Sequence, residues 1–394
     1  MRAAARMLCA AAAFALLAAP SAAASTSHLS RELSELQRAG VSVPLVAKPV
    51  LRQTLTVNEP ALAETYQPGV AWEWQWTAAR VDEVPDSVLR AASAVKIAVI
   101  DSGADVAAPD LAAKTPATWS VLSRSTRVRD ALGHGTFVSS LAAGSVDNGV
   151  GISGFGGDAQ LLVVQAIDTD GYMTDVDEAA AIVYAVRHGA RIVNLSVGGA
   201  ETSLVERRAV RWAAAHGVLV VAAAGNEHDE GNRPDYPAAL LQPLGSNGRG
   251  GIGLSVGATS MDGARAYFSN TGSYVSLAAP GYNVFAAESA DSPWPRAQPP
   301  WASPGFYGWA SGTSFSSPEV AGAAALVWGA NPKLTAQQVA SVLKQSAVGN
   351  GWNRELGWGR LDAAAAVQLA QQTTGEALRQ ARYEPRPIHS SPPS

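Results

Sequence analysis

Ser311-Gly312-Thr313-Ser314-Phe315-Ser316-Ser317-Pro318 is a run of small, hydroxyl-bearing residues that leads directly into an apolar stretch, residues 320–328. Glycine at 312 permits close backbone approach and unusual φ values, and proline at 318 is compatible with the first turn of a helix. The run therefore predicts a helix whose N-terminus carries a serine hydroxyl. Free N–H groups at such a terminus favour negative charge, which develops when a nucleophilic serine attacks an acyl group. Taken alone, the run favours the alternative of an ordinary Ser/Thr helix cap.

Around this run, short apolar segments alternate with stretches of helical periodicity. The apolar segments are residues 95–100, 161–167, 191–197, 218–224 and 253–258, and the helical stretches are residues 136–143, 175–188, 203–216, 313–330, 335–347 and 361–371. Short and nearly continuous apolar segments are typical of parallel strands that are buried on both faces. The alternation predicts an α/β fold with three α/β/α layers around a mostly parallel central sheet.

The composition is that of a globular chain with one large or two ordinary domains. The chain has 394 residues, of which 47% are hydrophobic and 16% charged, and its net charge is −4. No basic run is interleaved with aromatic residues, so we expect no nucleic-acid partner. Cys9 is the only cysteine, and because it lies in the N-terminal segment discussed next, we expect no disulfide in the mature chain.

Residues 1–24 have the pattern of a secretory signal. Arg2 and Arg6 precede an apolar run, and small residues at 21–24 suit a signal peptidase. An uncleaved membrane anchor is the alternative, although the run is shorter than the ~20 residues of a spanning helix. Residues 25–57 form a short N-terminal extension or pro-segment, and residues 373–394 are proline-rich without periodicity, which predicts a disordered tail. We expect a protein secreted to the periplasm or the medium, monomeric, with no membrane anchor after signal removal.

Three polar residues lie where the predicted sheet would place a ligand site. Asp101 directly follows a predicted strand, and ligands of open α/β sheets bind beyond the carboxyl ends of the strands. His134 lies between two glycines at a predicted helix start, and Asn226 follows another predicted strand. Each has an ordinary alternative: a turn or cap for Asp101, core packing for His134 and a Gly-Asn turn for Asn226. Together with Ser314, they give the chain order Asp, His, Asn, Ser.

The order Asp, His, Ser is one of three that catalytic triads adopt, and the surrounding sequence is specific. Residues 97–103 (IAVIDSG), 133–138 (GHGTFV) and 312–318 (GTSFSSP) resemble the aspartate, histidine and serine motifs of the subtilisin-like serine proteases, the subtilase or S8 family. Residues 194–199 (NLSVGG) and 223–227 (AAGNE) resemble the family's substrate-wall strand and its oxyanion asparagine segment. The resemblance covers about residues 70–370.

The resemblance implies a subtilisin-like catalytic domain at residues 58–372 that acts as a serine endopeptidase on proteins or peptides through an acyl-enzyme. It assigns a catalytic triad to Asp101, His134 and Ser314, and an oxyanion-hole amide to Asn226. The walls that would hold the substrate are formed by Ser196, Val197, Gly198, Ala223, Ala224 and Gly225. Small apolar walls favour an apolar substrate side chain, whereas Glu227 would favour a basic one. A catalytically silent binding protein of the same fold, and a processing protease dedicated to one partner, are the alternative functions.

Three features depart from the family pattern or stay open. Residues 25–57 are shorter than the folded inhibitory pro-domain that the resemblance implies. The Pro/Trp-rich insertion at residues 288–307 is either a rim or lid beside the substrate groove or a packed surface loop. Asp168, Asp170 and Asp175 hint at an oxygen-ligand calcium loop. A polar turn is the simpler interpretation, so we expect no metal site and no cofactor, with calcium left open.

Overall fold

The computed structural model describes residues 5–7, 59–302 and 305–373. The predicted extension at residues 25–57, most of the predicted signal segment and residues 374–394 of the predicted tail lie outside these ranges. A short strand within the predicted signal segment, β1 (Ala5–Met7), pairs antiparallel with β7 (Tyr172–Thr174). Cleavage of the predicted signal would remove this strand.

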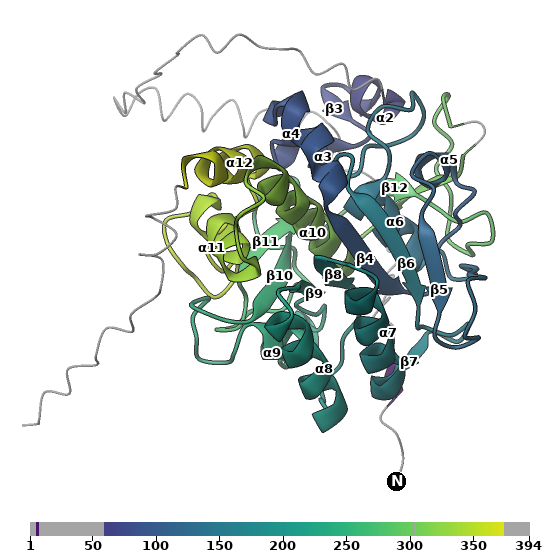
Figure 1. Ribbon diagram of the computed structural model, residues 1–394. Helices are drawn as coiled ribbons and strands as arrows, with labels where there is room; N and C mark the ends of the chain where they lie inside the picture. Colours follow the sequence, from purple (N-terminus) through teal and green to yellow (C-terminus); the bar gives the residue numbers. More distant parts are fainter. Residues whose placement is uncertain (1–4, 8–58, 303–304, 374–394) are drawn as a thin grey trace, which may run out of the picture. The chain divides into compact units, whose positions relative to one another are not determined.

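The central sheet has seven strands in the order β11-β10-β9-β8-β4-β6-β5, and every neighbouring pair is parallel (Figure 1). Its strands are β4 (Lys96–Asp101), β5 (Ala117–Ser120), β6 (Gln160–Gln165), β8 (Ile192–Leu195), β9 (Leu219–Ala223), β10 (Gly253–Thr259) and β11 (Leu277–Pro280). Each predicted apolar segment overlaps one of them, with bounds that differ by at most two residues. The prediction omits β5, a four-residue strand (Ala-Thr-Trp-Ser) in which only the last residue is buried, and β11, a short strand that ends in proline.

Helices cover both faces of this sheet (Figure 1). On one face lie α4 (Asp86–Ala91), α6 (His134–Ala143), α10 (Thr313–Ala330), α11 (Ala336–Ser346) and α12 (Ala363–Gln372), and on the other lie α7 (Asp175–Arg187), α8 (Leu204–Ala215) and α9 (Ala238–Leu241). Successive strand residues point to opposite faces. Val99 accordingly belongs to the core cluster of Phe137, and Ile100 to the cluster of Ile182. The predicted three-layer α/β/α fold is therefore confirmed.

The remaining elements are short. They are α2 (Pro60–Ala63), α3 (Trp74–Ala78), α5 (Pro109–Ala112), the 3-10 turns η1 (Val81–Glu83), η2 (Ala92–Ala94) and η3 (His228–Glu230), and two antiparallel hairpins, β2 (Thr65–Gln67) with β3 (Val70–Ala71) and β12 (Val284–Ala287) with β13 (Tyr307–Ala310). The predicted insertion at residues 288–307 spans the connection between β12 and β13, and β13 leads directly into α10.

The topology brings the candidate residues to one edge of the sheet. Strands β4, β8 and β9 are neighbours and parallel, so their carboxyl ends lie together. Asp101 is the last residue of β4, and the wall segments that begin at Ser196 and Ala223 stand at the ends of β8 and β9. α10 packs against β8, β9 and β10, which places its N-terminal serine near the same edge.

Candidate active site

Asp101 and His134 form a buried hydrogen-bonded pair. The Nδ1 atom of His134 lies 2.8 Å from Oδ1 of Asp101, and the exposed fractions of the two residues are 1% and 0%. The same carboxylate oxygen accepts the backbone N–H of Ser102 at 2.7 Å. His134 is the first residue of α6, and the preceding Gly133 has φ 82°, a left-handed conformation that favours glycine. The turn before the helix thus directs the imidazole at the end of β4.

Charge around His134 favours its protonated form. Burial lowers the pKa of the imidazole, but the adjacent Asp101 carboxylate and its hydrogen bond, together with the more distant Asp130, raise it further than burial lowers it. The pKa of His134 therefore lies above its ordinary value. A histidine with this bias is a competent proton acceptor whose protonated state is stabilised by the buried carboxylate.

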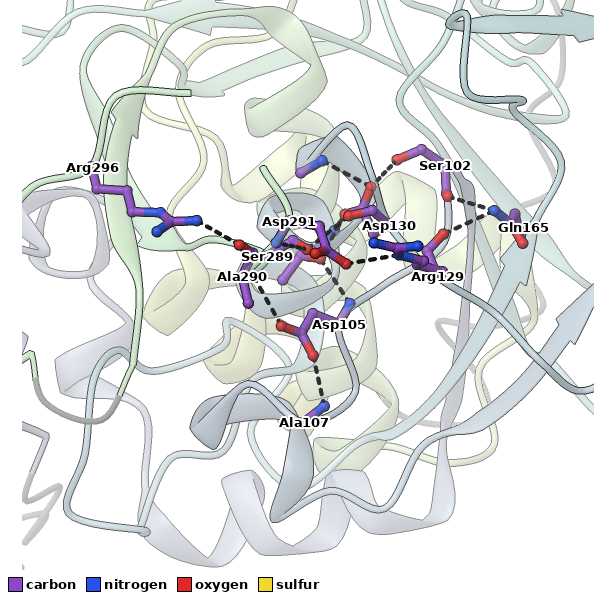
Figure 2. Close-up of polar contacts among 12 residues, drawn as sticks. Ser102, Asp105, Ala107, Arg129, Asp130, Gln165, Ser289, Ala290, Asp291 and Arg296 are labelled. Carbon is purple, nitrogen blue, oxygen red and sulfur yellow. Dashed lines mark hydrogen bonds and ion pairs between the residues drawn. The ribbon is translucent and has the colours of Figure 1, made fainter. Parts of the chain in front are cut away.

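Asp130, which the sequence analysis does not single out, holds the loop before His134. Its carboxylate accepts hydrogen bonds from Ser102 Oγ at 2.8 Å, Gly133 N at 2.9 Å, Thr136 N at 2.7 Å and Thr136 Oγ1 at 2.6 Å. Ser102 follows Asp101 in the chain, whereas Gly133 and Thr136 flank His134. The buried carboxylate therefore joins the segment that carries Asp101 to the segment that carries His134. Figure 2 shows its contact with Ser102.

The start of α10, which carries Ser314, differs from the prediction in two details. Gly312 has φ 161° and ψ 154°, which is extended backbone open to any residue, so no unusual φ requires glycine there. Pro318 lies inside the helix instead of in its first turn. Because proline has no N–H, the carbonyl of Ser314 receives no hydrogen bond from residue 318. That carbonyl accepts one from Ser196 Oγ at 2.6 Å, which ties the helix start to the end of β8.

The hydroxyl of Ser314 lies at this junction between the helix and the sheet. It donates to the backbone carbonyl of Ser196 at 3.2 Å, and within the described residues it makes no hydrogen bond to His134. The imidazole is nevertheless a neighbour, since its centroid lies 5.6 Å from the ring of Phe315. Catalytic hydrogen bonds often tighten only when the substrate binds, so this spacing is compatible with a serine and base pair.

Asn226 is fixed beside the serine segment. Its side-chain oxygen accepts hydrogen bonds from the backbone N–H of Thr313 at 2.9 Å and from Thr313 Oγ1 at 3.0 Å. A backbone N–H can only donate, so this contact identifies the amide oxygen and directs the NH₂ group to the other side. The predicted oxyanion donor therefore lies next to the residue that precedes Ser314.

The predicted wall segments contain the buried residues Ser196, Val197, Ala223 and Ala224 and their glycines Gly198 and Gly225. Two carboxylates flank the glycines. A Cβ atom on Gly198 would collide with the carboxylate of Asp235, and one on Gly225 would lie 2.7 Å from Asp235 Oδ2 and 2.8 Å from Glu227 Oε2. The sequence analysis identifies Glu227 but not Asp235. The contacts of Asp235 join segments that are far apart in the sequence. The carboxylates can come this close to the wall segments only because both positions are glycine.

Comparison with known proteins agrees with this geometry. Residues 92–359 match the model of the subtilase family of peptidases. The chain belongs to the subtilase family. It is 32% identical to thermitase of Thermoactinomyces vulgaris over 281 residues, a match that covers 70% of this chain and 89% of thermitase. It is 33% identical to subtilisin E of Bacillus subtilis (strain 168), with 70% of this chain and 66% of subtilisin E covered.

Solved structures give the same result. The crystal structure of fervidolysin from Fervidobacterium pennivorans, described as a keratinolytic enzyme related to subtilisin, superposes with a TM-score of 0.64 at 26% identity. The match covers 73% of this chain but 45% of fervidolysin, so this chain spans less than half of that enzyme. The predicted family and subtilisin-like fold are confirmed, and the chain is a serine-protease-type hydrolase.

In this subtilase the Pro/Trp-rich insertion reaches the imidazole. The centroid of Trp294 lies 6.2 Å from that of His134, and the two rings are nearly perpendicular. Trp301, from the same insertion, packs instead on Trp72, Phe285 and Tyr307. The insertion thus has one aromatic residue at the candidate site and one in a separate aromatic cluster.

Within the described ranges, no group of at least three His, Cys, Asp or Glu residues could hold a metal ion. The Oδ1 atom of Asp168 accepts the backbone N–H groups of Asp170 at 3.0 Å and Tyr172 at 2.9 Å, which closes a turn. Asp175 begins α7. In the described part of the chain, no helix combines the length and the apolar character needed to cross a membrane.

Proposed function

We propose that this subtilase is a secreted serine endopeptidase that cleaves peptide bonds with Asp101, His134 and Ser314. The observation that carries the proposal is the buried 2.8 Å hydrogen bond between His134 Nδ1 and Asp101, formed beside the helix N-terminus that presents Ser314. With its Nδ1 proton donated to the carboxylate, the neutral imidazole keeps the Nε2 lone pair for the serine proton. The secretory pattern of residues 1–24 supports export.

In the proposed reaction, Ser314 Oγ attacks the scissile carbonyl carbon as His134 Nε2 takes its proton. Asp101 stabilises the imidazolium, and the oxyanion is bound by the Asn226 NH₂ group and the backbone N–H of Ser314. The positive end of α10 adds to this stabilisation. Collapse of the intermediate breaks the C–N bond, His134 protonates the leaving amine, and an ester remains on Ser314. Water then attacks the ester by the same steps in reverse.

The walls define how a peptide would lie. We propose that an extended protein or peptide substrate pairs with the backbone of residues 196–198 as an added strand, opposite residues 223–225. Every proton and electron pair in the scheme is handled by side chains or backbone of this chain, so the proposed reaction requires no cofactor. We further propose that the mature enzyme acts as a monomer.

A catalytically silent binding protein is the competing function. It is favoured by the Ser314 hydroxyl, which donates to Ser196 and not to His134. Labelling of the purified chain with a fluorescent fluorophosphonate, followed by peptide mapping, decides between the two. We expect a stoichiometric adduct on Ser314, retained after dialysis against a chelator and lost in Ser314→Ala and His134→Ala. A folded wild-type protein that forms no adduct would support the binding function and refute the enzyme.

A further inference from the structure

Residues 289–294, here called the strap, run from the β12–β13 hairpin onto two loops. One loop follows Asp101, and the other precedes His134. The contacts of the strap with these loops are Ser289 Oγ to the Asp130 carbonyl at 2.7 Å, Ala290 N to Asp105 Oδ2 at 3.0 Å and Arg129 Nε to Asp291 Oδ2 at 2.8 Å. Figure 2 shows these interactions, together with a hydrogen bond from Arg296 to the carbonyl of Ala290 at 2.6 Å. The strap is therefore fastened to both loops at once.

The second half of the strap approaches the imidazole at close range. Ser292 is buried against Gly133, and a Cβ atom at that glycine would collide with the Ser292 side chain. Ser292 Oγ in turn accepts the backbone N–H of Trp294 at 3.1 Å. Glycine before His134 thus has a second use besides its left-handed φ, because it admits the strap. Through Ser292, the backbone of Trp294 is therefore fixed relative to the loop that precedes His134.

The indole of Trp294 completes an aromatic wall beside His134. Its centroid lies 6.2 Å from His134, 6.0 Å from Phe137 and 6.3 Å from Phe315, all in edge-on arrangements. Such rings are held in place by packing and by their electrostatic preference for edge contacts. The side chain of Trp294 is only partly buried, so part of its surface remains accessible beside the imidazole.

The position of the aromatic wall indicates which part of a substrate it would contact. The walls at residues 196–198 and 223–225 adjoin Ser314 and Asn226 and would hold the acyl part of the peptide. The second half of the strap contacts Gly133, His134 and Phe137, and His134 must lie next to the leaving amine in order to protonate it. We propose that Trp294 is a specificity-determining residue on the leaving-group side, and that it restricts the residue immediately after the scissile bond to small side chains.

This proposal rests on the proposed protease function, and it differs from a purely structural role of Trp294 in what it predicts. If the indole only stabilised the catalytic loop, its removal would lower the rate for all substrates by the same factor. If it bounds a subsite, its removal changes the ranking of substrates at one position. Trp301 provides a matched control, because it is a tryptophan of the same insertion that packs away from His134.

The experiment measures kcat/KM for internally quenched peptides that vary the two residues flanking the scissile bond, one at a time. Wild type, Trp294→Ala, Trp294→Phe and Trp301→Ala are compared, each normalised to the concentration of fluorophosphonate-reactive sites. For Trp294→Ala we expect kcat/KM for peptides with Phe or Leu after the scissile bond to rise about tenfold relative to peptides with Ala there, which corresponds to about 1.4 kcal/mol. Trp294→Phe should show a gain between those of wild type and Trp294→Ala. The ranking of residues before the scissile bond should be unchanged in both variants, and Trp301→Ala should match wild type at both positions.

A reactive enzyme whose leaving-side ranking is unchanged in both Trp294 variants would overturn the strap proposal and leave the protease function intact. A change confined to the acyl side would also overturn it. If Trp294→Ala does not fold, Trp294→Phe supplies the same comparison. A wild-type protein that forms no fluorophosphonate adduct refutes the proposed function, and the strap proposal with it.

Discussion

Replacement of Asp130 by asparagine tests how the loop that precedes His134 is held in place. Asp130 accepts two hydrogen bonds from backbone N–H groups, those of Gly133 and Thr136, and two from hydroxyl groups. The hydroxyls can rotate, but the N–H groups cannot. Since they bind different oxygens of the carboxylate, the NH₂ group of an asparagine faces one of them in either orientation. One buried N–H group therefore loses its acceptor, and the other is left with a neutral acceptor in place of a charged one.

The expected loss follows from these two changes. A buried donor left without a partner costs about 1–3 kcal/mol, and a hydrogen bond to a charged group is stronger than a neutral one by about 1 kcal/mol. We expect Asp130→Asn to lower the free energy of unfolding by about 2–4 kcal/mol. The acid limb of the rate profile should also move to lower pH, because the negative charge of Asp130 helps to raise the pKa of His134.

Stability would be measured by urea denaturation in a Ser314→Ala background, which prevents self-digestion, and the pH profile by the rate of fluorophosphonate labelling in the active chain. Asp105→Asn is the control, because Asp105 also accepts two backbone N–H groups but is partly exposed, so water can replace its contacts. It should cost less than about 1 kcal/mol. An Asp130→Asn variant as stable as this control, with an unshifted labelling profile, would refute the role assigned to Asp130.

Three further outcomes are expected. The carboxylate of Asp235 lies against the wall glycines Gly198 and Gly225, so we expect it to favour a basic substrate side chain on the acyl side of the scissile bond. Asp235→Asn should lower the preference for Arg over Phe there by about fivefold in kcat/KM, since a hydrogen bond to a charged group is stronger than a neutral one by about 1 kcal/mol; an unchanged preference argues against this role of Asp235. Asp101→Asn should lower the pKa of His134 seen in the labelling profile, because it removes the charge that raises that pKa, and a profile identical to wild type would contradict the pairing. Burial raises the pKa of Asp110 to about 7, so the unfolded chain releases this proton first and Asp110 should lower stability by up to about 4 kcal/mol between about pH 4 and pH 7. Thermal unfolding should show a decline over this range, and Asp110→Asn should make it less steep but not abolish it, because burial also raises the pKa values of Glu59 and Glu288 to about 7.

The sheet could be predicted from the sequence because its signal is local. Five apolar segments each overlap a strand, and helix α10 begins and ends where its sequence predicts. Strand β5 could not be found in this way, because its four residues (Ala-Thr-Trp-Ser) form no continuous apolar segment and lie at the edge of the sheet. Tertiary pairing with β6 decides its conformation, and no local pattern encodes that pairing.

The candidate site was predictable only where a residue lies in a recognisable motif. Asp101, His134 and Asn226 follow strands or begin a helix, and their neighbours in the chain identify them. Asp130 and Asp235 have no such marker, because their importance arises from partners that come together only in the folded chain. Asp235 meets Gly198 from a different loop. The Pro/Trp content of the insertion drew attention to that segment, but nothing in its sequence shows that Trp294 meets His134 and Trp301 does not.

Pro318 shows why a local rule fails at a functional helix. A proline inside a helix is unfavourable because it leaves the carbonyl four residues earlier without its N–H partner. Here that carbonyl belongs to Ser314, and the hydroxyl of Ser196 takes the vacant position. Asn194 donates to the same hydroxyl and accepts from Ser317, so the helix of the proposed nucleophile and the proposed substrate wall share one hydrogen-bond network. The local defect is thus offset by a contact that fixes the serine relative to the strand along which a peptide would bind, which is the kind of exception to helix propensity expected at a site under functional constraint.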